Sequence, residues 1–351
     1  MSEPSELKRL YWRLLAARRS LLLPLRRAIA PHRVRHLAGP SSTAFKPEDL
    51  VVVCMVRDGE PWAGEFVDHY RSKGATHLVF LDNGSVDDTK DIIREAGDGI
   101  TLMETTLSFL EYQEILKDWM ARTFSGDAWV LVADIDEFFD YPFSSAIGVP
   151  GLLRYLNEAG YSDVLVQMLD MYSDQSPGDP LGHFLDDCLY YETESIRKQS
   201  IEKKLLDYGS ISSNPRVQQH YGGVQERIFG TPLLLSKMSM FRPSAGVRLT
   251  NNHWCENARL ADFSCVVRHF KFVGGLHARA VDAVHRNNHW AGSMHYRNVK
   301  RVMEGDRAGM VSTISQRWNG VDQLVDDGFL VVSDEYREKM TLDRRFADKD
   351  V

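Results

Sequence analysis

The stretch Asp127-Ala-Trp-Val-Leu-Val-Ala-Asp-Ile-Asp-Glu-Phe-Phe-Asp140 is an apolar run that ends in carboxylates. Every side chain from Ala128 to Ala133 is apolar, which is typical of a strand buried on both faces of a parallel sheet. A strand that continued through Asp134 and Asp136 would place both carboxylates on one face. At about 4 Å and an effective dielectric near 20, two such charges repel by roughly 4 kcal/mol. The pair therefore needs a raised pKa, a bound cation or a polar ligand, unless these residues form a polar turn that caps a helix.

The residues around this run alternate between strand and helix patterns. Strands are expected at 51–56, 77–81, 100–103 and 128–133, and helices at 62–73, 89–96 and 112–124. This alternation predicts a Rossmann-like α/β fold, with a mostly parallel sheet flanked by helices. Ligands of such sheets bind outside the carboxyl ends of the strands. Three polar loops, at 57–60, 82–85 and 134–137, are therefore expected to converge at that edge.

After residue 150 the pattern becomes less regular. A helix is expected at 152–158, a strand at 164–169, loops over 173–225, strands near 227–229, 233–241 and 265–272, and helices at 276–289, 296–303 and 334–340. The chain is thus expected to divide into a leader and linker (1–45), the main α/β domain (46–275) and a helical extension packed on it (276–351). The part after residue 173 is expected to be loop-rich and helical.

The composition is ordinary for a globular protein, but its charge is uneven. Hydrophobic residues make up 43% of the 351 residues and charged residues 26%. Residues 1–40 hold nine Lys or Arg and two Glu, a net +7, so that the rest of the chain carries a net −14. The acidic remainder argues against nucleic-acid binding, whose affinity depends on phosphate neutralisation. The four cysteines form no Cys-x-x-Cys pair, which favours a reducing compartment such as the cytoplasm.

Residues 1–40 have the character of a basic amphipathic segment. They contain no apolar run approaching the 18 or more residues that cross a bilayer, and arginines follow their apolar patch, unlike a signal peptide. The segment is therefore predicted to lie on an anionic membrane surface. A helix packed on the domain and a disordered leader are the alternatives.

Several segments resemble a known enzyme family. Cys54–Glu60 (CMVRDGE), Leu81–Thr89 (LDNGSVDDT) and Asp134–Phe138 (DIDEF) resemble the opening of a family 2-type glycosyltransferase. Later segments resemble its bacterial branch related to the family 92 (DUF23) enzymes: Gly222–Gly230 (GGVQERIFG), Arg268–Phe272 (RHFKF) and His289-Trp290. The resemblance covers roughly residues 50–300. It implies a GT-A fold and transfer of a sugar from a nucleotide-activated donor, with inversion. The implied acceptor is a glycan, a lipid-linked unit or another hydroxyl group, as in the synthesis of cell-envelope polysaccharide, and it would bind the loop-rich and helical part after residue 173.

The resemblance also implies a metal site. Asp134 and Asp136 match the Asp-x-Asp motif, whose carboxylates bind a divalent ion on the donor's diphosphate and touch its ribose. Hard oxygen ligands suit Mg²⁺ or Mn²⁺, and the ion stabilises the departing nucleoside diphosphate. His269 matches a late histidine that completes the metal shell in many GT-A enzymes, although a histidine between Arg and Phe is also compatible with a structural role.

Other residues are candidates for donor binding. Asp82 and Asn83 match the loop that reads the base, and an Asx turn starting a helix is the simpler alternative. The family more often has two acidic residues there, so Asn83 leaves open whether the donor is a UDP-sugar or a GDP-sugar. Arg57 follows the first strand and is a candidate for base, ribose or phosphate contact, or a solvated surface residue. Candidate cations for the diphosphate are Arg227, Lys237 and Lys271.

An inverting reaction needs a general base near the acceptor hydroxyl. Asp170, Glu226 and His253 are the candidates, and each is equally compatible with a surface charge or a structural hydrogen bond. Two other functions remain open. A phosphatase of the haloacid dehalogenase type would use Asp134 and Asp136, one of them as nucleophile, but Phe138 stands where that family usually has Thr or Val. A catalytically silent domain that binds a nucleotide or a glycan is the other, and the intact carboxylates argue against it.

Overall fold

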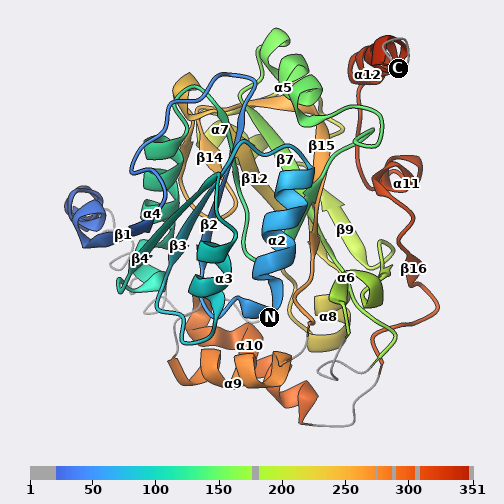
Figure 1. The fold of residues 1–351 in the computed structure, drawn as a ribbon. Coiled ribbons are helices and arrows are strands. Elements are labelled where there is room, and N and C mark those ends of the chain that lie inside the picture. The colour runs from blue at the N-terminus through green and yellow to red at the C-terminus, as the bar shows by residue number, and fades with distance from the viewer. Residues whose placement is uncertain (1–20, 176–181, 274, 287–289, 305–308, 348–351) are drawn as a thin grey trace.

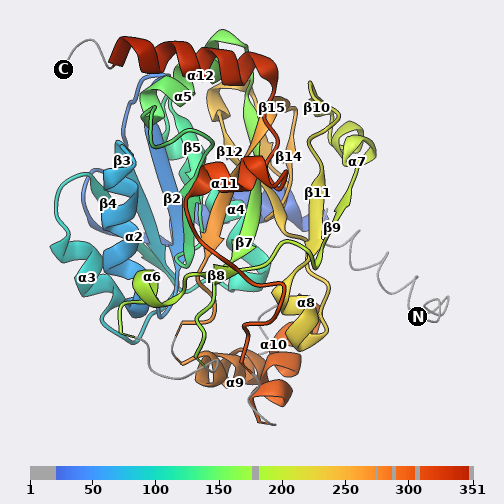
Figure 2. The same ribbon diagram turned by 90° about the vertical axis from the view of Figure 1, so that its right-hand side faces the viewer.

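The central feature of the computed structural model is a ten-stranded sheet with helices packed on both faces (Figures 1 and 2). The structure describes residues 21–175, 182–273, 275–286, 290–304 and 309–347. Along the sheet the order is β1-β4-β3-β2-β5-β12-β7-β15-β10, and β6 pairs with β15. The strands are β1 Val34–Ala38, β2 Leu50–Val56, β3 His77–Asp82, β4 Ile100–Thr105, β5 Trp129–Val132, β6 Glu137–Asp140, β7 Asp163–Asp170, β10 Ile211–Ser212, β12 Ser236–Phe241 and β15 Arg259–His269.

Most neighbouring strands run parallel. β4, β3, β2 and β5 form one parallel group, and β7, β15 and β10 form another. β12 lies between the two groups and is antiparallel to both of its neighbours, while β1 and β6 pair antiparallel at the sides. The expected fold class, a mixed α/β fold with a large, mostly parallel sheet flanked by helices, is confirmed.

The remaining elements cover this sheet or extend it. The longer helices are α2 Glu60–Ser72, α3 Thr89–Glu95, α4 Phe109–Phe124, α5 Val149–Glu158, α9 Leu276–Arg286, α10 Trp290–Met303 and α12 Asp334–Ala347. The short ones are η1 Ala30–Arg33, α6 Phe184–Asp187, α7 Glu202–Asp207, α8 Val224–Phe229, η2 Pro243–Ala245 and α11 Val321–Asp326. Two-stranded pairs are β9 Ile196–Gln199 with β11 Gln219–Gly222, β13 Arg248–Leu249 with β14 Cys255–Glu256, and β8 Tyr190–Tyr191 with β16 Gln316–Arg317. None of the helices in the described ranges is long and apolar enough to cross a bilayer.

The apolar run of β2 shows why the sheet is buried on both faces. Successive side chains of a strand point to opposite faces. Val52, Cys54 and Val56 join the core cluster that contains Trp62 and Phe66 of α2. Val51, Val53 and Met55 join the second cluster, which contains Leu116 and Met120 of α4. Both sets of side chains are buried, so β2 has no polar face.

The strand expected at 128–133 is present as β5, which ends at Val132, so the condition under which Asp134 and Asp136 would share a face is not met. A turn follows, and β6 starts at Glu137 as an antiparallel strand. The expectation of a strand at 227–229 is wrong, because these residues belong to the short helix α8. Gly223 and Gly230 bound this helix with φ of 72° and 68°, which L-residues with side chains rarely adopt.

Part of the expected leader belongs to the sheet. β1 pairs antiparallel with β4, and the chain then passes closely over β4 at Gly39. A Cβ atom at Gly39 would lie 1.9 Å from the carbonyl oxygen of Ile100, so only glycine fits there. The expected linker is also attached, because Thr43 Oγ1 donates a hydrogen bond of 2.5 Å to the carbonyl of Phe124.

The C-terminal helices lie at opposite ends of the sheet. α9 follows the carboxyl end of β15, and α9 and α10 lie below the sheet in Figure 1, whereas α12 lies near α5 at the top. α9, α10 and α8 share an apolar cluster that includes Phe229, Leu276 and Val299. α9 and α10 are thus positioned at the sheet edge where ligands of α/β folds bind.

Candidate functional site

Three strands end in polar residues at the carboxyl edge of the sheet. Asp82 ends β3, Asp170 ends β7 and His269 ends β15, while Asp134 follows β5. β15 lies between β7 and β6, and its register places His269 opposite Asp170 on one side and Glu137 on the other. The topology therefore gathers residues that are far apart in the sequence.

His269 lies between two carboxylates. Its Nδ1 donates to Asp170 Oδ1 at 2.7 Å, and its Nε2 lies 3.3 Å from Asp136 Oδ2. Gln225 donates from Nε2 to both oxygens of Asp170, at 2.8 and 3.0 Å. Burial alone would lower the pKa of His269, but the two carboxylates raise it to about 10. Burial alone would raise the pKa of Asp136, but the contact with His269 keeps this pKa below its usual value.

This row fits a divalent metal ion. A carboxylate oxygen and an imidazole nitrogen are donors that Mn²⁺ accepts. A metal-binding histidine typically donates its other nitrogen to a carboxylate, which fixes the ring orientation, and Asp170 holds His269 in this way. Among the residues that the structure describes, no group of three His, Cys, Asp or Glu forms a complete site. Asp136, whose side chain is 21% exposed, and His269 would therefore supply two of the ligands.

Asp134 faces two lysines rather than Asp136. Its oxygens lie 2.7 Å from Lys117 Nζ and 3.2 Å from Lys237 Nζ. Glu137 pairs with Lys237 and accepts a hydrogen bond of 3.1 Å from the backbone N–H of Asp134. Burial would raise the pKa of Asp134, but the two ammonium groups hold it well below its usual range. A shared face of Asp134 and Asp136 required the strand to persist, and instead the turn after β5 sends the two side chains to different partners.

Two further cations flank Asp136. Lys271 lies close enough to lower the pKa of Asp136, and its Nζ sits 5.1 Å from the centre of the Tyr296 ring. Arg279 of α9 lies 4.8 Å from the centre of the Trp62 ring and donates to the carbonyl of Lys271 at 2.9 Å. Burial lowers the pKa of Arg279, and Asp136 opposes that shift. Positive charge therefore surrounds the row at this end of the sheet.

The loop after β3 is fastened by its own side chains. Asp82 Oδ1 accepts from the N–H groups of Gly84 and Ser85 at 2.9 and 3.0 Å, as in an Asx turn. The other Asp82 oxygen is buried and has no hydrogen-bond partner among the described residues. Asn83 Nδ2 donates to the carbonyl oxygens of residues 105 and 107. Arg57 donates to the carbonyl of Asn83 at 3.3 Å, and its side chain is 37% exposed at the rim of this loop.

Two residues expected in the site have other partners. Arg227 donates to both oxygens of Glu192, and the side chain of Glu192 is only 1% exposed. This pairing leaves the expected phosphate contact of Arg227 without support. Glu226 pairs with Arg197 at 2.8 Å, on the side of α8 next to β9. His289 lies outside the described residues, as does the side chain of Trp290.

The candidates for general base are also separated by their contacts. Asp170 is buried and engaged by His269 and Gln225, so it holds the histidine and is not placed to accept a proton from an acceptor. His253 Nδ1 donates to the carbonyl of Ser236 at 2.9 Å. Burial, assisted by nearby Lys237, lowers the pKa of His253 to about 4, so the ring is neutral at pH 7.

Sequence reasoning did not find Lys117, Gln225 and Arg279. Lys117 is buried on the inner side of α4 beside Leu116, and a lysine within an apolar helix face is a usable signal of a buried ion pair. Gln225 lies in a motif that the resemblance names, but nothing in the motif shows which of its residues points to β7. Arg279 stands in a helix without any local pattern that sets it apart from the other arginines.

Comparison with known proteins gives partial likenesses to solved structures only. No family model and no curated protein matches the sequence. One similar structure is TarS residues 1–349 of S. aureus, at 16% identity and TM-score 0.29, covering 40% of this chain and 43% of that chain. Another is the mannosyltransferase PcManGT of Pyrobaculum calidifontis in complex with GDP-Man and Mn²⁺, at 18% identity and TM-score 0.26, covering 47% of each chain.

A third similar structure is glucosyl-3-phosphoglycerate synthase of Mycobacterium tuberculosis in complex with Mn²⁺, UDP and glucosyl-3-phosphoglycerate. The identity is 18% and the TM-score 0.24, over 38% of this chain and 50% of that chain. The present chain thus matches half or less of each of these three proteins. Solved structures similar to this one therefore include glycosyltransferases. With TM-scores below 0.5 these likenesses do not extend to function, and the fold class rests on the strand order itself.

Proposed function

We propose that this chain transfers a sugar from a nucleotide-sugar donor to a hydroxyl acceptor, using Mn²⁺ or Mg²⁺. The observation that carries the proposal is the row Asp136–His269–Asp170 at the carboxyl edge of the sheet, with distances of 3.3 and 2.7 Å. It joins two segments that resemble family 2-type glycosyltransferases, and it offers metal ligands beside the positive charge of Lys271 and Arg279. The finer placement, in the bacterial branch related to family 92, is part of the same proposal.

The metal ion and the diphosphate of the donor are assigned to the part of this edge around Asp136 and His269. Asp136 and His269 would hold the ion, which offsets the negative charge that develops on the departing nucleoside diphosphate. Lys271 and Arg279 surround this position with positive charge that suits a diphosphate. Asp134, held by its two lysines, borders the ion site and is assigned to the ribose rather than to the metal.

The loops after β2 and β3 are assigned to the nucleoside. The unpaired buried oxygen of Asp82 is an acceptor for a base N–H, since a buried acceptor without a partner is costly. The amide nitrogen of Asn83 is already used, so only its carbonyl oxygen remains for the ligand. Arg57 at the rim can reach a ribose or a phosphate. Both UDP-sugars and GDP-sugars agree with these donors and acceptors.

His253 is the preferred candidate for the general base. Glu226 is paired with Arg197, and Asp170 is engaged by His269, whereas His253 is neutral and borders the Lys237–Asp134 pair. A hydrogen bond from Nδ1 to a carbonyl leaves Nε2 as the proton acceptor. The proposed reaction inverts the sugar's configuration in one displacement. A glycan or lipid-linked unit of the cell envelope is the proposed acceptor, at the cytoplasmic face of the membrane.

A panel of nucleotide sugars with Mn²⁺ tests this function. The thermal unfolding temperature should increase with one UDP-sugar or GDP-sugar, and this increase should require the metal. Mass spectrometry should then show that the donor is consumed. Asp136→Asn should abolish both effects. The matched control is Asp326→Asn, which makes the same change at an exposed position of α11. No response to any nucleotide sugar would refute the proposal. Binding without turnover would favour the catalytically silent domain. Hydrolysis of a phosphate ester by the native protein, abolished by Asp134→Asn, would favour the phosphatase.

A further inference from the structure

The helical residues 21–29 expose an apolar face to solvent. The exposed positions of this helix are all apolar: Leu21, Pro24, Leu25, Ala28 and Ile29. They follow helical spacing and lie on one side, here called the outer face. Leu21, Leu25 and Ile29 are 82%, 56% and 38% exposed. Helices on the surface of soluble proteins normally have the opposite arrangement, with polar residues outward.

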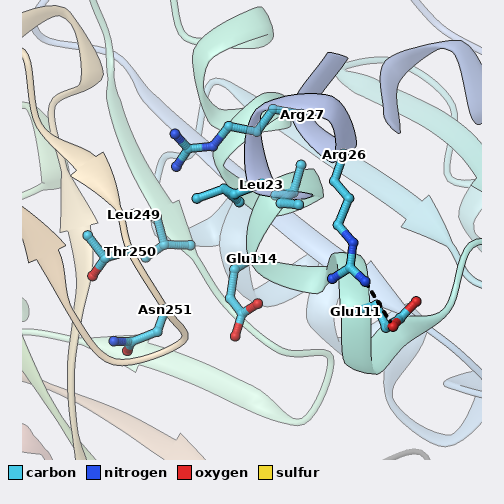
Figure 3. Close-up of a pocket in the computed structure, with 9 residues that line it drawn as sticks. Leu23, Arg26, Arg27, Glu111, Glu114, Leu249, Thr250 and Asn251 are labelled. Atoms are coloured by element: carbon cyan, nitrogen blue, oxygen red, sulfur yellow. Dashed lines mark hydrogen bonds and ion pairs between the residues drawn. The ribbon is translucent and has the colours of Figure 1, made fainter. Parts of the chain in front are cut away.

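The arginines of this helix point toward the protein. Arg26 donates to Glu111 at 3.0 Å (Figure 3). It also lies 5.5 Å from the centre of the Tyr112 ring, and both partners are at the start of α4. Arg27 lines a pocket of about 290 Å³ between this helix, α4 and the loop at 249–251. Leu23 packs against the core, and Ala30, which follows the helix, is fully buried. These contacts fix the helix, so the outer face is a stable feature of the surface.

The charge around the outer face selects its partner. The described residues 21–40 contain four arginines (Arg26, Arg27, Arg33 and Arg35) and no acidic residue, whereas residues 41–351 carry a net −14. Arg33 follows the helix directly and is exposed, whereas Arg35 is 72% accessible and forms an ion pair with Glu104 of β4. An apolar face bordered by basic residues suits an anionic bilayer, to which each lysine or arginine near the surface adds about 1 kcal/mol. A second copy of the chain fits less well, because two basic segments would meet.

We propose that the outer face inserts into the surface of an anionic lipid bilayer, with the flanking basic residues on the lipid phosphates. The helix contacts the first turns of α4, which begin just after the carboxyl end of β4. The edge of the sheet that holds the proposed site would then lie near the membrane, where a lipid-linked acceptor is found. The docking surface itself does not depend on the proposed sugar transfer.

Vesicle sedimentation at low salt tests the docking surface on the full chain. Vesicles of phosphatidylcholine with phosphatidylglycerol should bind the protein, and pure phosphatidylcholine should not. Leu21→Ser/Leu25→Ser/Ile29→Ser should weaken the binding at least about tenfold, which corresponds to about 1.4 kcal/mol. The control Leu206→Ser/Ile211→Ser changes residues that are 69% and 55% exposed elsewhere and should bind like the native protein.

A fluorescent label gives an independent measurement. The four native cysteines are all buried, so a thiol-reactive dye on Leu25→Cys should report this position alone. Its emission should shift to the blue with anionic vesicles, whereas a dye on Leu206→Cys should not respond. Absence of binding to anionic vesicles, or binding that survives the triple serine change, would overturn the proposal. A shift that depends on protein concentration and not on lipid would overturn it in favour of self-association. Sugar transfer to a soluble acceptor should be unchanged in the triple variant. Vesicle binding and sugar transfer therefore test the docking surface and the proposed function independently.

Discussion

Replacing Lys237 by Met tests the buried charge cluster behind the turn after β5. The side chains of Lys237 and Glu137 are 9% and 2% exposed, and they contact each other directly. Without the ammonium group, the Glu137 carboxylate keeps only the hydrogen bond from the backbone N–H of Asp134. Leaving one partner of a buried ion pair uncompensated costs roughly 3–5 kcal/mol of unfolding free energy. Asp134 adds little to this cost, because it retains Lys117 and is 39% exposed.

The double variant Lys237→Met/Glu137→Gln distinguishes a charge effect from a packing effect. Glu137→Gln alone should cost about 1–2 kcal/mol, since its amide oxygen still accepts the N–H of Asp134. The double variant should nevertheless be more stable than Lys237→Met, with a coupling of about 2–3 kcal/mol in urea unfolding at pH 7. Lowering the pH should also reduce the cost of Lys237→Met, because burial raises the pKa of the unpaired Glu137 and the folded state then takes up a proton. If the two substitutions add without coupling, the ion pair does not stabilise the turn.

Other expected outcomes concern the metal site, one corrected residue and a buried histidine. Asp136→Asn and Asp170→Asn should each lower Mn²⁺ affinity at least about tenfold by isothermal titration calorimetry, the second because Asp170 orients the ligand; unchanged affinity in both would exclude this site. Arg227→Met should leave nucleotide affinity unchanged but cost about 3 kcal/mol of stability, because the buried Glu192 carboxylate loses its charged partner; weaker nucleotide binding at unchanged stability would contradict this. Burial lowers the pKa of His220 to about 3 in the folded state. Between pH 6.5 and pH 3 only the unfolded state therefore protonates this histidine, and the free energy of unfolding decreases as the pH is lowered. At pH 5 this amounts to about 2 kcal/mol, which His220→Phe should remove; equal pH dependence in urea unfolding of the two proteins would refute it.

The strands β2, β3, β4, β5 and β7 were predictable because they are buried on both faces. An apolar run such as that of β2 leaves few alternatives at this length. β1 and β6 were not found, since each mixes charged with apolar residues over four or five positions and depends on its partner strand. The segment 227–229 was too short to show a period, and the glycines that bound α8 determined the result instead.

The site could be predicted only in part for a related reason. The pattern after the apolar run indicated Asp136 and a resemblance indicated His269, but their contact depends on the register of β15, which no local pattern reveals. The pairing of Asp134 was missed because its lysine partners are 17 and 103 residues away in the sequence. A spacing of two between carboxylates predicts a common face only while the strand lasts, and here it ends at Val132.

The antiparallel strand β12 also constrains how the chain is made. It fills the place between β5 and β7, although it is synthesised about a hundred residues after β5. Chains emerge from the ribosome at roughly 5–20 residues per second. For several seconds, then, β5 and β7 each present an unpaired edge to the surroundings, and such edges pair readily with other chains. A protein truncated before Ser236 would retain both edges permanently, so ribosomal stalling in this region should produce aggregation rather than a partly active fragment.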